Sequence, residues 1–262
     1  MAEPVIFWKG HGTENDFVLL PADADLTPAR VAALCDRRAG IGGDGVIRVA
    51  HEDGRWFMDY WNSDGSLSEM CGNGVRVFAL HLREEHGVTF PLEVATRDGV
   101  KVLRESELGF TADMGSPQVL GDTSVSVGER TWDAVHVDLG NPHAVAFVDD
   151  LADAGPLHDA PVHDPAVYPE GVNVEFVVRR GERHVAMRVH ERGSGETRSC
   201  GTGACAVMVA AAVADGAPLP ATYRVDVPGG TLEVTLDGPL DQGGRVHLDG
   251  PAVIVAAGTT SW

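Results

Sequence analysis

The sequence predicts an α+β fold made of two similar halves, and three observations lead to this prediction. Short runs rich in Val, Ile, Phe and Thr recur between Gly, Pro and Asp breaks, which is typical of strands. Only three segments have the pattern of helices, and they do not alternate regularly with the strands. A cysteine followed by a glycine-rich turn occurs twice, at Cys71 and Cys200, 129 positions apart in a chain of 262 residues. Such spacing, close to half the chain, indicates an internal repeat.

The predicted strands are expected to form a mostly antiparallel arrangement, because turn-forming residues separate them at short intervals. The composition is that of an ordinary globular protein, with 44% hydrophobic and 23% charged residues. A chain of this length can bury a substantial core. The clearest strand predictions are residues 46–50, 56–61, 172–178, 184–190, 223–227 and 231–236.

The first predicted helix covers residues 28–38. Thr27 precedes it as a capping residue, and Pro28 occupies the first helical position, where its missing N–H costs nothing. The other two predicted helices begin directly after the repeated cysteines. They cover about residues 72–85, ending near Gly87, and about residues 201–215, ending at Gly216.

The charge balance excludes several classes of partner. The chain has 39 acidic residues against 20 Lys and Arg, a formal net charge of −19. Such a chain repels phosphate backbones and anionic membranes, so we predict no nucleic-acid or membrane partner. The N-terminal residues lack the pattern of a signal peptide, and the most apolar stretch, residues 204–214, is too short to span a bilayer. A cytoplasmic location is therefore predicted.

The chain has four cysteines, which are Cys35, Cys71, Cys200 and Cys205. They are too few for a disulfide-stapled scaffold of this length. None forms a C-x-x-C pair, so the sequence predicts no structural metal site. We interpret Cys35 and Cys205 as packing residues, since both lie inside predicted helices among apolar neighbours.

Further residues recur at nearly the spacing of the two cysteines. Nine positions before Cys71 and Cys200 lie Asn62 and Glu191, each at a predicted strand end, and Asn15 recurs as Asn141, 126 positions later. We expect two similar halves that face each other across a cleft, each with one cysteine at a helix N-terminus. The predicted domains are residues 1–114 plus 251–262, which carry Cys71, and residues 115–250, which carry Cys200.

A cysteine at a helix start meets backbone N–H groups and the positive end of the helix dipole. This environment favours the thiolate and is expected to lower the thiol pKa. The dipole supplies only about 0.3–1 kcal/mol, less than one pKa unit, so activation must also draw on other neighbours or on bound substrate. The glycines after each cysteine let a carboxylate approach the backbone N–H groups closely.

Two thiols on opposite faces of one α-carbon can invert that carbon. One thiolate removes the α-proton, and the opposite thiol returns a proton to the other face. The same N–H groups would stabilise the charge that develops on the substrate carboxylate. Cys71 and Cys200 are therefore predicted to be a catalytic acid–base pair. The alternative, that both are inert buried cysteines, does not account for the repeated glycine-rich helix start.

Residues 62–76, NSDGSLSEMCGNGVR, resemble the signature of the diaminopimelate epimerase family. Further matches occur in the same order along nearly the whole chain. They are residues 12–17, 140–143, 171–173, 191–193 and 199–203. The resemblance implies two pseudo-symmetric domains, each a curved sheet wrapped around a central helix. It also implies interconversion of LL- and meso-diaminopimelate in lysine and peptidoglycan precursor biosynthesis, without pyridoxal phosphate or metal, by a homodimer.

The resemblance also implies a role for each matched residue. Cys71 would act on the L-configured centre and Cys200 on its mirror form, and Arg192 can bind the distal carboxylate of the substrate through two parallel hydrogen bonds. Glu191 can meet an ammonium group, and His143 is an auxiliary residue that could position a thiol or the substrate. The remaining substrate-binding residues implied are Asn15, Asn62, Gly72, Asn73, Asn141, Asn173, Gly201 and Thr202.

This chain departs from the family pattern at Gly45, where members often carry Gln. Any contact that the Gln side chain makes in the family is therefore not expected here. Residues 40–45 match G-x-G-x-x-G, but they follow a helix and precede a strand, the reverse of a dinucleotide site. The alternatives left open are a proline or hydroxyproline racemase-like enzyme, a thiol-redox sensor that uses Cys71 and Cys200, and an inactive ligand-binding module.

Overall fold

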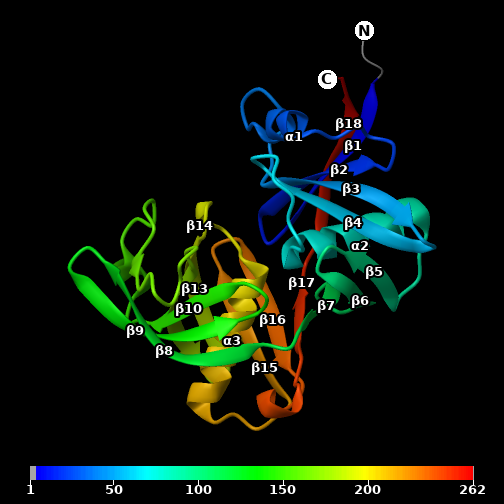
Figure 1. The fold of residues 1–262 in the computed structure, drawn as a ribbon. Helices are drawn as coiled ribbons and strands as arrows, with labels where there is room; N and C mark the ends of the chain where they lie inside the picture. The colour runs from blue at the N-terminus through cyan, green and yellow to red at the C-terminus, as the bar shows by residue number, and fades with distance from the viewer. Residues whose placement is uncertain (1–3, 262) are drawn as a thin grey trace. The chain divides into compact units, whose positions relative to one another are not determined.

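The computed structural model describes residues 4–261, and the chain folds into two compact units (Figure 1). Unit 1 comprises the chain up to Ala112 together with the stretch that begins at Asp249, and unit 2 comprises Asp113–Leu248. Both units consist mainly of strands, and the described residues contain three α-helices, which confirms the α+β prediction.

Unit 1 is a sheet in the spatial order β18-β1-β2-β3-β4-β5-β6-β7. Neighbouring strands are antiparallel except for the parallel pairs β2–β3 and β4–β5. The elements are β1 (Val5–Gly12), β2 (Asn15–Pro21), α1 (Pro28–Cys35), β3 (Gly45–Glu52), β4 (Arg55–Asn62), α2 (Gly72–His86), β5 (Leu92–Thr96), β6 (Gly99–Glu105), β7 (Phe110–Gly115) and β18 (Val253–Thr260).

Unit 2 repeats this order as β8-β9-β10-β12-β13-β15-β16, again with two parallel pairs, β10–β12 and β13–β15. The internal repeat inferred from the sequence is therefore confirmed in the strand topology. The elements are β8 (Gln118–Val127), β9 (Arg130–Asp138), β10 (Pro142–Phe147), β11 (Val162–His163), β12 (Asn173–Gly181), β13 (His184–Glu191), β14 (Gly195–Thr197), α3 (Gly201–Asp215), β15 (Ala221–Val227), β16 (Gly230–Leu236) and β17 (Val246–Gly250), with short 3₁₀ turns at Leu151–Ala154 and Leu240–Gln242.

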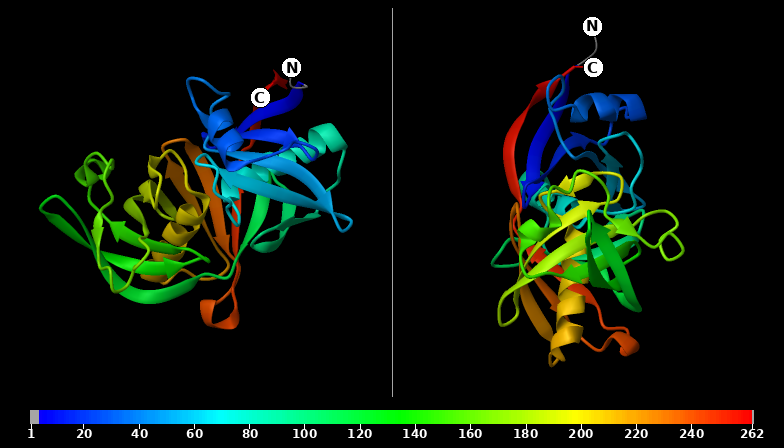
Figure 2. Two further views of the ribbon diagram at one scale, coloured as in Figure 1. Left: turned by 45° about the horizontal axis from the view of Figure 1, so that its top comes forward. Right: turned by 90° about the vertical axis from the view of Figure 1, so that its left-hand side faces the viewer.

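Each unit has one long helix that its sheet curves around (Figures 1 and 2). In α3, eleven of the residues from Gly201 to Ala212 are Ala, Val, Met, Cys or Gly on all sides of the helix, and only Thr202 in that stretch is not buried. A helix that is apolar all round is stable only inside a core. The position of α3 in the centre of unit 2 therefore follows from its sequence, and α2 takes the same place in unit 1.

The helix predicted for residues 28–38 is shorter than expected and ends at Cys35. Thr27 caps its start as predicted, accepting a hydrogen bond from the N–H of Arg30. At the other end, the carboxylate of Asp36 accepts hydrogen bonds of 2.7 Å from the N–H groups of Arg38 and Ala39. These local bonds compete with the helical pattern and turn the chain out of the helix.

Candidate active site

Cys71 and Cys200 occupy the same position at the start of a central helix. Each is the N-cap residue in extended conformation, with φ −137° and ψ 121° at Cys71 and φ −119° and ψ 117° at Cys200. The Sγ atom of Cys71 accepts a hydrogen bond from the N–H of Gly74 at 3.4 Å, and that of Cys200 from the N–H of Gly203 at 3.3 Å. Both thiols are thus held against the N-terminus of a helix, as the sequence predicts.

In unit 1, Asn15 connects the cysteine to the loop before β3. Its Oδ1 accepts a hydrogen bond from Nδ2 of Asn73 at 3.2 Å and lies 3.6 Å from Sγ of Cys71, a weak S–H donor. Its Nδ2 donates to Oδ2 of Asp44 at 2.7 Å. Asn15, Cys71 and Asn73 therefore form one cluster, which we call the N-terminal half-site.

Gly45 is the position at which the sequence departs from the expected family pattern, and Asp44 precedes it. A Cβ added to Gly45 would lie 2.5 Å from the carbonyl oxygen of Trp61, so the backbone leaves no room for a side chain there. The preceding carboxylate of Asp44 instead holds Asn15 and accepts from the N–H of Asp16 at 3.1 Å. Asn62, the last residue of β4, pairs with Gly45 across the strands and donates to Oγ of Ser66 at 3.0 Å.

Arg76 lies fully buried beneath the first turn of α2. Its guanidinium donates to Oδ1 of Asn73 at 2.9 Å, to the carbonyl of Gly72 at 3.1 Å and to the carbonyl of Pro251 at 3.4 Å. These bonds hold the helix start and the Asn73 amide in place below Cys71. Arg76 therefore supports the N-terminal half-site from inside the core.

The variant Arg76→Met is expected to lower the free energy of unfolding by about 1–3 kcal/mol, because the buried oxygens that accept from Arg76 each lose one donor. Urea unfolding of the variant and the wild type measures this difference. A variant as stable as the wild type would contradict the structural role given to Arg76.

In unit 2, Asn141, Thr202 and His143 surround Cys200. Nδ2 of Asn141 donates to Oγ1 of Thr202 at 3.3 Å, and that hydroxyl lies 3.5 Å from Sγ of Cys200. Oδ1 of Asn141 lies 3.1 Å from Nε2 of His143. The Nδ1 atom of His143 lies 2.7 Å from Oε1 of Glu175. These five residues form the C-terminal half-site.

Asn173, Glu191 and Arg192 lie at the ends of β12 and β13 in unit 2. Oδ1 of Asn173 accepts from the backbone N–H of Arg192 at 3.0 Å, and its Nδ2 donates to the carbonyl of Pro142 at 3.1 Å. The hydroxyl group of Thr197 donates a hydrogen bond to Oε1 of Glu191. Arg192 is exposed, and its aliphatic stem runs beside Gly171, where an added Cβ would lie 3.3 Å from Cδ of Arg192.

The environment of Cys200 corrects the expectation that its pKa would be lowered. Burial and the carboxylates of Glu191 and Glu175 raise the pKa of Cys200 well above its ordinary value, and the hydrogen bonds from Thr202 and Gly203 only partly offset them. Burial likewise raises the pKa of Glu191. The helix dipole is a small effect beside desolvation. These surroundings therefore favour the neutral thiol of Cys200.

The two remaining cysteines lie in the core. Cys35 is buried at the end of α1, and burial raises its pKa to about 11. Cys205 is fully buried inside α3. All four cysteines are free thiols. Neither Cys35 nor Cys205 is placed to act as a thiolate.

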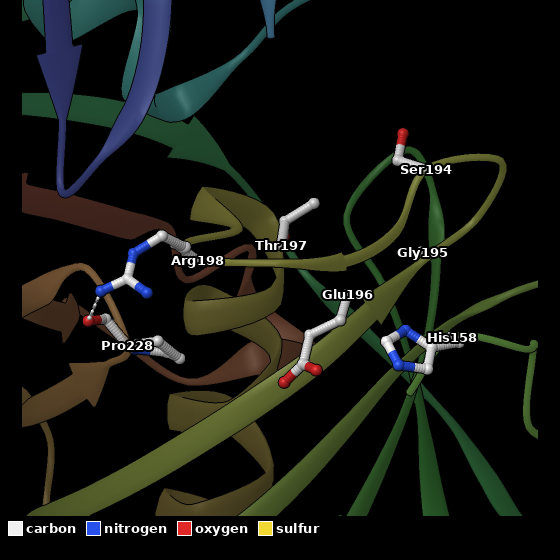
Figure 3. Close-up of a pocket in the computed structure, with 7 residues that line it drawn as sticks. All are labelled: His158, Ser194, Gly195, Glu196, Thr197, Arg198 and Pro228. Carbon is white, nitrogen blue, oxygen red and sulfur yellow. Dashed lines mark hydrogen bonds between the residues drawn. The ribbon is translucent and has the colours of Figure 1, made fainter. Parts of the chain in front are cut away.

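A surface pocket of unit 2 lies beside the chain that leads from Arg192 to Cys200 (Figure 3). Its lining includes Ser194, Glu196 and Arg198, and Arg198 donates to the carbonyl of Pro228 at 2.9 Å. None of the predicted site residues lines this pocket. Among residues 4–261 there is no group of three or more His, Cys, Asp or Glu side chains arranged to hold a metal ion, and no helix long and apolar enough to cross a membrane.

Three residues that bond to the predicted site residues were not predicted from the sequence, namely Asp44, Arg76 and Glu175. Arg76 lies within the family-like segment 62–76, so its position was available as a signal. Glu175 left a weaker signal, a single carboxylate in the otherwise apolar run from Val174 to Val178. A buried charge in such a strand needs a partner, and that partner, His143, lies 32 positions away.

Comparison with known proteins relates this chain to diaminopimelate epimerases. The family model described as diaminopimelate epimerase matches residues 7–120 and 135–255. The diaminopimelate epimerase of Streptomyces coelicolor is 58% identical over 98% of this chain and 96% of its own length. Those of Mycolicibacterium smegmatis and Rhodococcus opacus are 44% and 45% identical, over 97% and 98% of this chain and 96% and 98% of theirs.

Solved structures with the same fold are more distant in sequence. A PhzF-family phenazine biosynthesis protein of Bacillus anthracis has a TM-score of 0.74 at 17% identity, covering 98% of this chain and 99% of its own. A hydroxyproline epimerase of Agrobacterium vitis has a TM-score of 0.73 at 14% identity, covering 100% and 94%. At these identities the likeness concerns the fold alone.

Proposed function

The chain belongs to the diaminopimelate epimerase family, and we propose that it interconverts LL- and meso-diaminopimelate by two-base proton transfer between Cys71 and Cys200. One observation carries the mechanism. Both thiols cap the central helix of a repeated unit with nearly the same backbone angles and the same hydrogen bond from the residue three positions on. Two equivalent acid–base groups are what inversion of one carbon requires.

In the direction from LL to meso, the thiolate of Cys71 takes the α-proton, so that an S–H bond forms as the C–H bond breaks. The electron pair left on the α-carbon delocalises into the substrate carboxylate. Cys200 then donates its thiol proton to the opposite face and becomes the thiolate. The raised pKa of Cys200 supports this order, since it keeps the thiol protonated until the carbanion forms.

The substrate carboxylate at the reacting carbon is proposed to bind the first N–H groups of the two helices, at Gly72, Asn73, Gly201 and Thr202. At these positions an α-helix makes no N–H bond of its own, and its dipole favours an anion. The donors stabilise the negative charge that grows on the carboxylate during proton removal.

The far end of diaminopimelate carries a second carboxylate and a second ammonium group. We propose that Arg192 binds that carboxylate and that Glu191 meets an ammonium group. Asn15, Asn62, Asn141 and Asn173 then hold the substrate without adding charge, and His143 is an auxiliary group beside Cys200. No cofactor or metal takes part in this scheme. The family resemblance also leads us to propose a cytoplasmic homodimer, whose mass gel filtration with light scattering would measure.

The experiment that tests the function is α-proton exchange in deuterated water. With LL-diaminopimelate we expect deuterium at the α-carbon and formation of the meso isomer, whereas L-proline should remain unlabelled. Exchange of L-proline alone would favour a proline racemase-like enzyme. An absence of exchange with both amino acids would contradict an epimerase and favour a thiol-redox sensor that uses Cys71 and Cys200.

A further inference from the structure

The two half-sites have different side chains beneath equivalent helix starts. A Cβ added at Gly74 of α2 would lie 3.3 Å from Cδ1 of Ile47 and 3.4 Å from Cζ of Phe17. A Cβ added at Gly203 of α3 would lie 2.7 Å from Oε1 of Glu175. The site beneath Cys71 is therefore apolar, whereas the site beneath Cys200 holds a carboxylate.

The strand register shows that these side chains occupy equivalent positions. Across the parallel pair β2–β3, Phe17 lies opposite Gly45, and two residues further on is Ile47. Across the parallel pair β10–β12, His143 lies opposite Asn173, and two residues further on is Glu175. The pair Phe17 and Ile47 in unit 1 thus corresponds to the pair His143 and Glu175 in unit 2.

The hydrogen bonds of His143 fix how many protons this pair holds. The amide oxygen of Asn141 only accepts, so Nε2 of His143 must carry a proton. The 2.7 Å contact between Nδ1 and Oε1 of Glu175 needs one further proton, which these two groups share. His143 is therefore held from both sides, by Asn141 at Nε2 and by Glu175 at Nδ1.

Both members of the pair are 0% exposed, and among the residues that the structure describes the Oε2 atom of Glu175 has no hydrogen-bond partner. Burying two polar groups costs desolvation energy that an apolar pair, such as the one in unit 1, avoids. The charged and titratable groups that face Glu175 come from four elements or loops. They are His143 of β10, Glu191 of β13, Cys200 of α3 and Tyr168 of the loop before β12, while His136 of β9 faces His143.

We infer that Glu175 is a positioning residue of the C-terminal half-site, which fixes the orientation of the His143 ring and thereby orders Asn141 and Thr202 beside Cys200. This inference rests on the proposed two-thiol reaction. Glu175 does not touch the substrate in this scheme. It makes the two thiols chemically unequal, because the equivalent position beneath Cys71 is Ile47.

The carboxylate of Glu175 also acts on Cys200 through its charge, which raises the pKa of that thiol. In Glu175→Gln the charge is lost, so the pKa of Cys200 falls. The Gln amide can still bond to Nδ1 of His143, but this bond carries no charge and holds the ring less firmly. The variant should therefore shift the titration of Cys200 and leave that of Cys71 in place.

The test is the pH dependence of kcat/KM for Glu175→Gln, measured in both reaction directions. In both directions the active enzyme holds one thiol and one thiolate, so kcat/KM falls at alkaline pH when the thiol with the higher pKa ionises. Because the pKa of Cys200 is raised well above its ordinary value, its titration is assigned to the alkaline limb of both profiles. That limb is expected to move to lower pH, and kcat is expected to fall about 10- to 100-fold with little change in KM.

Glu233→Gln is the matched control, because it removes the same charge from an exposed position of β16 in unit 2 and should leave both profiles unchanged. An unmoved alkaline limb in Glu175→Gln, or an equal shift of the acid limb, would overturn the inference. Absence of epimerisation by the wild type would instead contradict the proposed function. If Glu175→Gln does not fold, NMR of wild-type His143 decides: a proton on Nε2 and a hydrogen-bonded proton between Nδ1 and Glu175 are expected, and the absence of either would overturn the inference.

Discussion

Cys71→Ala and Cys200→Ala are each expected to reduce net epimerisation by about 10²- to 10⁴-fold, the contribution typical of a general acid or base. A single remaining thiol can remove the α-proton and return it only to the face that it left. Cys200→Ala should therefore still exchange the α-proton of LL-diaminopimelate for deuterium, slowly and with retained configuration. Formation of the meso isomer, followed by chiral chromatography, and α-deuterium content, followed by mass spectrometry, separate these two outcomes.

Cys35→Ala is the control for this pair, since Cys35 is buried at the end of α1 and its pKa is raised to about 11. It should epimerise at close to the wild-type rate, with a small loss of stability from the removed core volume. A wild-type rate in either Cys71→Ala or Cys200→Ala would reject the two-base scheme outright.

Gly203→Ala is expected to lose most of the activity, whereas the equivalent change Gly74→Ala should be tolerated better. Alanine favours a helix over glycine by about 1 kcal/mol, so local propensity alone predicts a gain in stability from both changes. At Gly203, however, the new Cβ would lie 2.7 Å from Oε1 of Glu175 and 3.2 Å from Sγ of Cys200. Overpacking of this kind costs about 1–3 kcal/mol and must displace the carboxylate or the thiol.

At Gly74 the nearest atoms are 3.3–3.4 Å away, at Ile47 Cδ1, Phe17 Cζ and the Cβ of Cys71. These neighbours need to move by only a few tenths of an ångström. Thermal unfolding and initial rates of the two variants measure the difference. Equal rates in Gly74→Ala and Gly203→Ala would contradict the difference in packing between the two helix starts.

Some features of the two half-sites depend on local sequence, and others depend on contacts made in the folded chain. The positions of Cys71 and Cys200 were predictable, because a helix start depends on residues within one turn: a capping side chain, a glycine three positions on and an apolar run behind it. The start of α1 at Thr27 was predictable for the same reason. Its end was not, because the side chain of Asp36 bonds to the N–H groups of Arg38 and Ala39 in place of the helical pattern.

The sequence by itself determined the α+β class, the repeat, the two helix-capping cysteines and the family, since all of these depend on patterns along the chain. Only the tertiary structure decided that Asp44 holds Asn15 and that Glu175 lies beneath Cys200. Those contacts join residues 29 and 32 positions apart through parallel strands, whose register depends on the packing of the whole sheet. The tertiary structure also raises the pKa of Cys200, which the helix start alone was expected to lower. Desolvation and nearby carboxylates outweigh the helix dipole, and the linear sequence does not reveal them.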